Sequence, residues 1–145
     1  MKIAVTGGTG FMNPLIPYIW IAGVMHLMIV GMNVPIPRIL CYQENLSKVS
    51  LMVRQIFIVH SVYIILVLIG FGLLCLLFAQ ELAGATPLGR FLSGCLAFFW
   101  SARLLIQLFY YDAQMKKKHY WVHLIFLSMI SFLSGIFLVA ALTSE

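Results

Sequence analysis

The chain has 145 residues, of which 63% are hydrophobic and only 9% are charged, and its mean hydropathy is +1.05. Soluble domains carry about 25% charged residues, so this composition excludes a soluble domain and indicates a membrane protein. The formal net charge of +5 lies mainly beside apolar runs, which favours a role in membrane topology over nucleic-acid binding. The length suits one domain. The three scattered cysteines have no CxxC spacing and argue against a disulfide framework.

The first eleven residues of the chain, MKIAVTGGTGF, carry a glycine pattern. With Gly7, Gly8 and Gly10, this opening resembles that of the extended short-chain dehydrogenase and NAD-dependent epimerase family. The resemblance implies a strand followed by a glycine turn that binds pyrophosphate. That site needs about 30 residues, with an acidic side chain about 20 residues further on. Here Asn13 takes the place of the third glycine and an apolar run follows, so we expect a non-functional remnant without NAD binding.

Four apolar runs follow this opening, and each is long enough to cross a bilayer, which takes about 20 helical residues. The runs cover residues 14–34, 56–79, 91–111 and 122–142. The sequence therefore predicts an all-α, four-helix transmembrane bundle. It forms a single domain over residues 14–142, with an N-terminal tail at residues 1–13 and a C-terminal tail at residues 143–145.

The connections between the runs are rich in polar residues and helix breakers. Residues 35–49 are predicted to form a loop with a short interfacial helix, and Ser47 or Ser50 is a candidate cap for the next helix. Residues 80–90 are predicted to form a turn, and residues 112–119 a short polar loop. Because the loop at residues 112–119 is short, the last two helices are predicted to be antiparallel neighbours.

Positive charge is distributed unequally between the two sides of the predicted bundle. One side carries Arg38, Lys48, Arg54, Lys116, Lys117 and Lys118. The other side carries Lys2 and Arg90. The positive-inside rule therefore predicts an integral protein of the inner (plasma) membrane of the cell, with both termini on the non-cytoplasmic side.

The third run combines two helical patterns. Ser93, Ala97 and Ser101 repeat every four residues, which allows a neighbouring helix to approach closely. A second stripe at helical spacing contains Trp100, Arg103, Gln107 and Tyr110. Arg103 is a full charge near the middle of an apolar run, and such a charge requires a partner in protein or water.

All four runs contribute polar side chains to the same, cytoplasmic half of the predicted bilayer. At a helix rise of about 1.5 Å per residue, His26 and Arg103 lie roughly 12 Å from the cytoplasmic ends of their helices, and His60 roughly 6–10 Å. Gln107 and His123 lie roughly 2–6 Å from those ends. These five residues form the candidate ligand site. Each also has a purely structural interpretation, as a group hydrogen-bonded across the bundle or at the membrane boundary.

Three functions fit this pattern. The sequence favours a scaffold or accessory subunit, which binds a membrane protein partner or a second copy of itself, because no catalytic set of residues is visible. One alternative is a binder of an anionic lipid, a quinone or a small acidic solute, with charge from Arg103 and hydrogen bonds from His60 and Gln107. A further alternative is a b-type haem or metal protein, with His26 and His60 as ligands and His123 in reserve.

Overall fold

The computed structural model describes residues 13–111 and 113–143. The glycine-rich opening that resembles the epimerase family lies outside the described residues. Every regular element in the described part of the chain is a helix. The prediction of an all-α fold is therefore confirmed.

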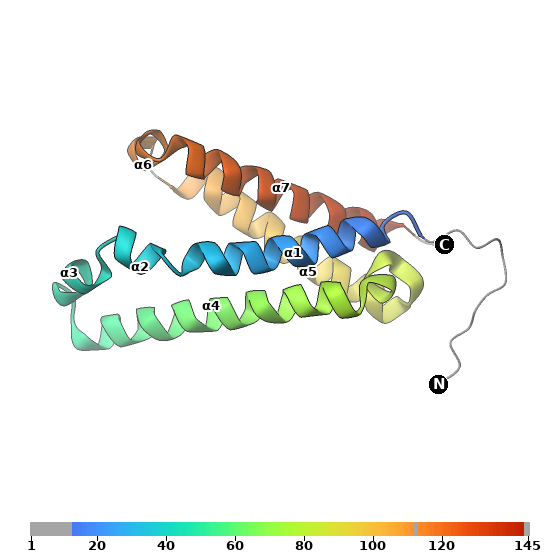
Figure 1. The fold of residues 1–145 in the computed structure, drawn as a ribbon, viewed down its shortest axis with the longest axis horizontal. Helices are drawn as coiled ribbons and strands as arrows, with labels where there is room; N and C mark the ends of the chain where they lie inside the picture. The colour runs from blue at the N-terminus through green and yellow to red at the C-terminus, as the bar shows by residue number, and fades with distance from the viewer. Residues whose placement is uncertain (1–12, 112, 144–145) are drawn as a thin grey trace.

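Four of the described helices are long and apolar enough to cross a membrane (Figure 1). They are α1 (Ile16–Asn33), α4 (Leu51–Leu77), α5 (Pro87–Leu105) and α7 (Tyr120–Leu142). The third crossing continues from α5 into a π-helix, η2 (Ile106–Tyr110), and so extends over Pro87–Tyr110. The chain is thus an integral membrane protein with the predicted four-helix bundle.

The connections contain more helix than the sequence predicts. The first connection holds two short helices, α2 (Ile36–Ile39) and α3 (Tyr42–Ser47). The predicted polar loop before α7 contains α6 (Ala113–Lys118), whose alanine, glutamine, methionine and lysine residues are strong helix formers. The turn predicted between the second and third runs contains a short helical segment, η1 (Glu81–Ala85), which the non-helical Gly84 interrupts.

Two long helices begin before their apolar runs because polar caps precede them. Ser50 Oγ accepts a hydrogen bond from the Val53 N–H at 3.4 Å, so Ser50 is the cap of α4, as one of the two candidates predicts. Thr86 Oγ1 accepts from the Gly89 N–H at 3.0 Å and caps α5. Pro87 occupies the first turn of α5. Backbone N–H groups there have no acceptor within the helix, so the N–H that proline lacks costs no hydrogen bond.

The four long helices form two antiparallel pairs, α1 with α4 and α5 with α7 (Figure 1). Small residues allow close contact within each pair. A Cβ atom added to Gly72 of α4 would lie 3.3 Å from the backbone oxygen of Gly23 of α1. In the other pair, the hydroxyl oxygens of Ser101 and Ser134 lie 2.6 Å apart and join α5 to α7.

The two pairs meet at the end of the bundle that carries η1, which packs against α1, α5 and α7. Gly84 has a φ of +96°, and this left-handed residue turns the chain back into α5. Ser93 Oγ donates to the Leu82 carbonyl at 2.7 Å, and Asn13 Nδ2 donates to the Ala83 carbonyl at 3.0 Å. These bonds satisfy carbonyl groups that the irregular turn leaves free.

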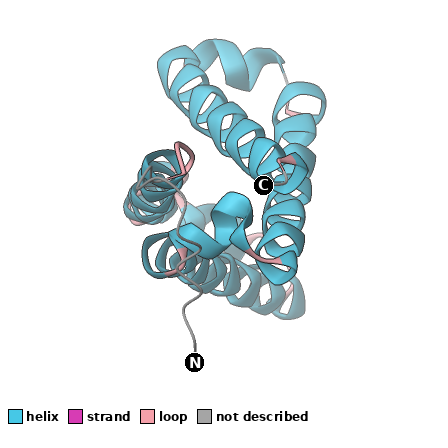
Figure 2. Cartoon of the chain, turned by 90° about the vertical axis from the view of Figure 1, so that its right-hand side faces the viewer, coloured by secondary structure: helices cyan, strands magenta, loops and turns pink. Residues whose placement is uncertain are grey.

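The two pairs separate toward the opposite end, which carries α2, α3 and α6 (Figures 1 and 2). We call it the basic end because it carries Arg38, Lys48, Arg54, Lys116, Lys117 and Lys118. The start of α1 and the end of α7 lie together at the other end (Figure 1). The bundle therefore has one tightly packed end and one divided, basic end.

Candidate functional site

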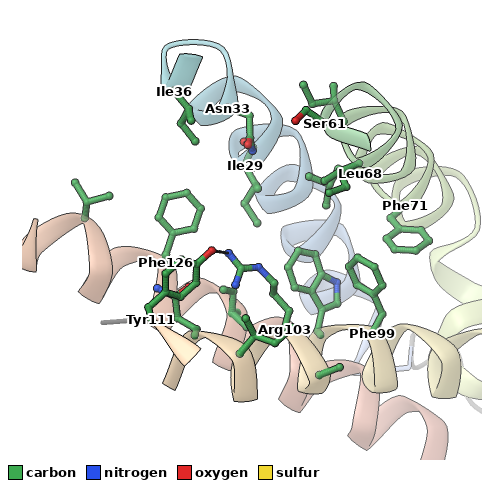
Figure 3. A pocket seen from close by; sticks show the side chains of 18 of the residues that line it. Ile29, Asn33, Ile36, Ser61, Leu68, Phe71, Phe99, Arg103, Tyr111 and Phe126 are labelled. Carbon is green, nitrogen blue, oxygen red and sulfur yellow. Dashed lines mark hydrogen bonds between the residues drawn. The ribbon is translucent and has the colours of Figure 1, made fainter. Parts of the chain in front are cut away.

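A cleft of about 1060 Å³ separates the two helix pairs (Figure 3). All four long helices line it, together with α2 and α3 at the basic end. Its walls are mainly apolar and include Leu68 and Phe71 of α4 and Leu96 and Phe99 of α5. Polar side chains line the part toward the basic end: Asn33, Tyr42, Ser61, Arg103, Gln107, Tyr111, Lys116, His119 and His123.

Arg103 reaches into this cleft beside Tyr111 (Figure 3). Its Nη2 donates to the Tyr111 hydroxyl at 3.4 Å, and its Cζ lies 5.5 Å from the centre of the same ring. Its other terminal nitrogen, Nη1, is buried and has no hydrogen-bond partner in the described part of the chain. A buried donor without a partner costs about 1–3 kcal/mol, and more when it is charged. The cleft therefore contains an incompletely paired cation.

The π-helix η2 brings two further predicted residues together. Gln107 is only 8% exposed, and its Nε2 lies 2.8 Å from His123 Nδ1 of α7. Lys116 Nζ donates to the Leu108 carbonyl at 2.7 Å, which holds α6 against the end of η2. Single π-turns of this kind occur frequently at functional sites. Arg103, Gln107 and His123, three of the five residues of the predicted cluster, thus line one cleft.

The stripe predicted on the third crossing is only partly present. Trp100 and Gln107 are buried and Arg103 is half-buried, whereas Tyr110 is 84% exposed. Hydrogen bonds in η2 run between residues five apart instead of four. Residues late in η2 are therefore rotated away from the face that a regular α-helix would give them.

Tyr42 belongs to the cleft although it lies in the first connection. Helix α3 places its ring edge-on against Phe57 of α4, with the ring centres 5.2 Å apart. Burial, and to a smaller extent the nearby phenol of Tyr111, raise the pKa of Tyr42 above its ordinary value. A tyrosine is neutral at pH 7 even with its ordinary pKa of about 10, so Tyr42 adds a neutral hydroxyl to the cleft.

His26 lies behind the aromatic wall of the cleft and is fully buried. Trp100 Nε1, which can only donate, lies 3.1 Å from His26 Nε2. Nε2 is therefore the acceptor, so Nδ1 carries the proton and donates to the Ala22 carbonyl at 2.6 Å. The rings of Phe71 and Phe137 also contact the imidazole. Because both nitrogens are occupied, His26 acts as a neutral structural group that joins α1 to α5.

His60 lies apart from the other predicted residues. It is exposed on α4, its Nδ1 lies 2.9 Å from the Ile56 carbonyl of its own helix, and it does not line the cleft. The structure does not bring His60 together with His26, whose nitrogens are both occupied, so the two do not fit the axial pair of a b-type haem. Within residues 13–111 and 113–143, no group of three or more His, Cys, Asp or Glu is arranged to hold a metal ion.

Six polar residues of the cleft lie outside the predicted cluster, and Tyr42, Tyr111 and Lys116 are among them. Tyr111 follows Arg103 by about two helical turns, and this spacing is a usable sequence signal. A lysine beside an apolar run is first interpreted as a topology determinant, so the sequence does not indicate that Lys116 lines the cleft. Nothing in the sequence near Tyr42 indicates that α3 would fold over the cleft.

The chain matches no protein-family model, no curated protein and no solved structure. The four apolar helices place it among integral membrane proteins. The chemistry of the cleft is therefore the observation from which a more specific function is inferred.

Proposed function

We propose that this protein binds the anionic headgroup of a membrane lipid in the cleft, with Arg103 as the principal contact. The observation that carries the proposal is the buried Nη1 atom of Arg103, which has no partner among the described residues and belongs to a side chain lining the cleft. A guanidinium is a planar fork of N–H donors that stays charged at any physiological pH. An anionic group would complete its hydrogen bonds and balance its charge.

The partner that Arg103 already has is a weak one. The Tyr111 hydroxyl is neutral and lies 3.4 Å from Nη2, which is longer than a strong charge-assisted bond of about 2.7–2.9 Å. The contact with the Tyr111 ring, at 5.5 Å, is of the kind that contributes about 0.5–2 kcal/mol. These contacts position the guanidinium without neutralising it, so an incoming anion gains a stronger interaction than the one it displaces.

The shape of the cleft favours a lipid over a small soluble anion. From Arg103 the cleft continues beside α5 as far as Leu92, roughly 16 Å along the helix axis. This is about half the thickness of a bilayer's hydrocarbon core. Phe98 lines the cleft and is 77% exposed, so the cleft is continuous with the lipid-facing surface of α5. A lipid can place its headgroup at Arg103 and its chains along the apolar walls.

Other ligands satisfy this site less completely. A quinone is uncharged and leaves the guanidinium unneutralised, whereas a small acidic solute leaves the apolar walls uncovered. The scaffold or accessory role, which the sequence favours, stays a prediction. A lipid held between the two helix pairs is compatible with that role, because it would also brace the divided end of the bundle.

Native mass spectrometry of the protein purified in mild detergent tests the proposal. We expect a retained lipid mass on the wild type, its loss in Arg103→Gln, and partial retention in Arg103→Lys, which keeps the charge but not the planar fork. Arg90→Gln is the matched control, because Arg90 is exposed and lies at the opposite end of the bundle. Equal retention in wild type and Arg103→Gln, with both proteins folded, would overturn the proposal.

A further inference from the structure

The polar part of the cleft contains two full positive charges. Arg103 supplies one and Lys116 of α6 supplies the other. None of the described residues that line the cleft is Asp or Glu, and a tyrosine such as Tyr42 is neutral at pH 7. With neutral histidines, the described lining therefore has a formal charge of +2. A single negative charge would leave one of these cations unbalanced.

Lys116 is held in a defined position. Its Nζ donates to the Leu108 carbonyl at 2.7 Å, and Leu108 follows Arg103 by roughly 7 Å along the helix axis. An ammonium has three donors, so two N–H groups remain beyond this bond. The side chain is half-buried, whereas the neighbouring Lys117 and Lys118 are exposed and do not line the cleft. Lys116 thus differs from the rest of its basic run.

We infer that the bound lipid carries a phosphate monoester headgroup, an inference that rests on the proposed function and narrows its ligand. A phosphate monoester has a charge of about −1.5 to −2 at pH 7 and three strong acceptor oxygens. It therefore balances Arg103 and Lys116 together. A phosphate diester or a carboxylate carries one charge and balances only one of them. The guanidinium fork suits two phosphate oxygens, and the ammonium serves as a point charge for the third.

The hydrogen-bonded pair of Gln107 and His123 lines the same cleft as these cations. The Gln107 amide retains a second N–H when one of its donors is used toward His123. His119 of the connection before α7 also lines the cleft. A headgroup with three acceptor oxygens can use these additional donors, whereas a carboxylate has fewer acceptor positions to offer them.

Lipid competition in nanodiscs tests this inference. The protein is reconstituted in neutral phosphatidylcholine with equal small amounts of phosphatidic acid, phosphatidylglycerol and a free fatty acid, and the lipids retained after extraction are quantified by native mass spectrometry. At pH 7.4 we expect phosphatidic acid to be retained about fivefold over the two singly charged lipids, the factor expected for one additional lysine contact. Lys116→Gln should remove this preference but keep binding of anionic lipid, while Lys117→Gln should retain it.

The outcomes separate this inference from the proposed function. Equal retention of all three anionic lipids, still lost in Arg103→Gln, would overturn the phosphate monoester and leave the lipid site standing. If lipid retention were unchanged in both Arg103→Gln and Lys116→Gln, the phosphate monoester inference and the proposed function would both be overturned. Inorganic phosphate at millimolar concentration should not displace phosphatidic acid, because it cannot cover the apolar walls. Displacement by inorganic phosphate would identify a free anion as the ligand and overturn the lipid assignment.

Discussion

The hydrogen bond from Trp100 to His26 joins the two helix pairs through buried polar side chains. It links α5 to α1 across 74 positions of sequence, and both side chains are almost completely buried. The bond settles which nitrogen of His26 carries the proton, since indole cannot accept. Its loss would leave an unsatisfied acceptor in an apolar interior, so its effect on stability should be measurable.

We expect Trp100→Phe to lower the free energy of unfolding by about 1–3 kcal/mol, because His26 Nε2 then lacks a donor. A double-mutant cycle with His26→Leu should give a coupling energy of about 1 kcal/mol, within the range of hydrogen bonds between transmembrane helices. Unfolding in mixed detergent micelles provides the measurement. Trp20→Phe is the control, since Trp20 is 46% exposed. Additive effects of the two buried substitutions would contradict the assigned bond.

At the level of elements, the contact between α1 and α4 depends on glycine. A Cβ atom on Gly72 would lie 3.1 Å from Leu27 Cδ2 and 3.3 Å from the Gly23 carbonyl oxygen, whereas a Cβ atom on Gly70 would meet nothing within 4 Å. The two glycines lie on the same helix, two residues apart, and differ in which way they face. They therefore form a matched pair for testing the packing of this helix pair.

Gly72→Val should lower the free energy of unfolding by about 1–3 kcal/mol, because the side chain forces α1 and α4 apart. Gly70→Val should cost much less, since its side chain points into open space at the lipid-facing surface. Thermal unfolding of both variants in the same detergent compares them directly. If the two valines destabilised the protein equally, Gly72 would not lie in the contact described.

For the whole molecule, the two ends of the bundle differ in packing and in charge. The divided end carries the polar part of the cleft and the basic connections, and the sequence pattern predicts that it faces the cytoplasm. Cys41 lies in the first connection at this end and is exposed, whereas Cys75 is buried in α4. Cys95 of α5 is also exposed. Once Cys95 is replaced, Cys41 is the accessible thiol that can report which side of the membrane the cleft opens toward.

In a Cys75→Ala, Cys95→Ala background, a membrane-impermeant maleimide should label Cys41 in inverted membrane vesicles but not in intact cells. The physical reason is that positively charged connections are retained on the cytoplasmic side. Mass shift after labelling provides the measurement, and permeabilised cells supply the positive control. Labelling of Cys41 in intact cells would contradict the predicted orientation and show that the cleft opens toward the outside.

The sequence predicts how deep each polar side chain lies in the membrane, but it does not predict which of these side chains point into the cleft. The depth of a side chain follows from its position along a helix, and that argument predicts Arg103, Gln107 and His123 in the same half of the bilayer. All three line the cleft. The direction in which a side chain points does not follow, and His60 is the example, since it faces outward on α4. In the π-helix η2 even the helical spacing changes, which exposes Tyr110.

The sequence by itself determined the membrane class, the number of crossings and the arrangement of basic connections. These properties follow from the transfer of each segment between water and lipid, which depends on local composition alone. The tertiary structure decided which helices pair, which donor serves His26 and where the cleft lies. A helix that is apolar on all its faces carries little information about its rotation, so only packing between helices sets which residues meet.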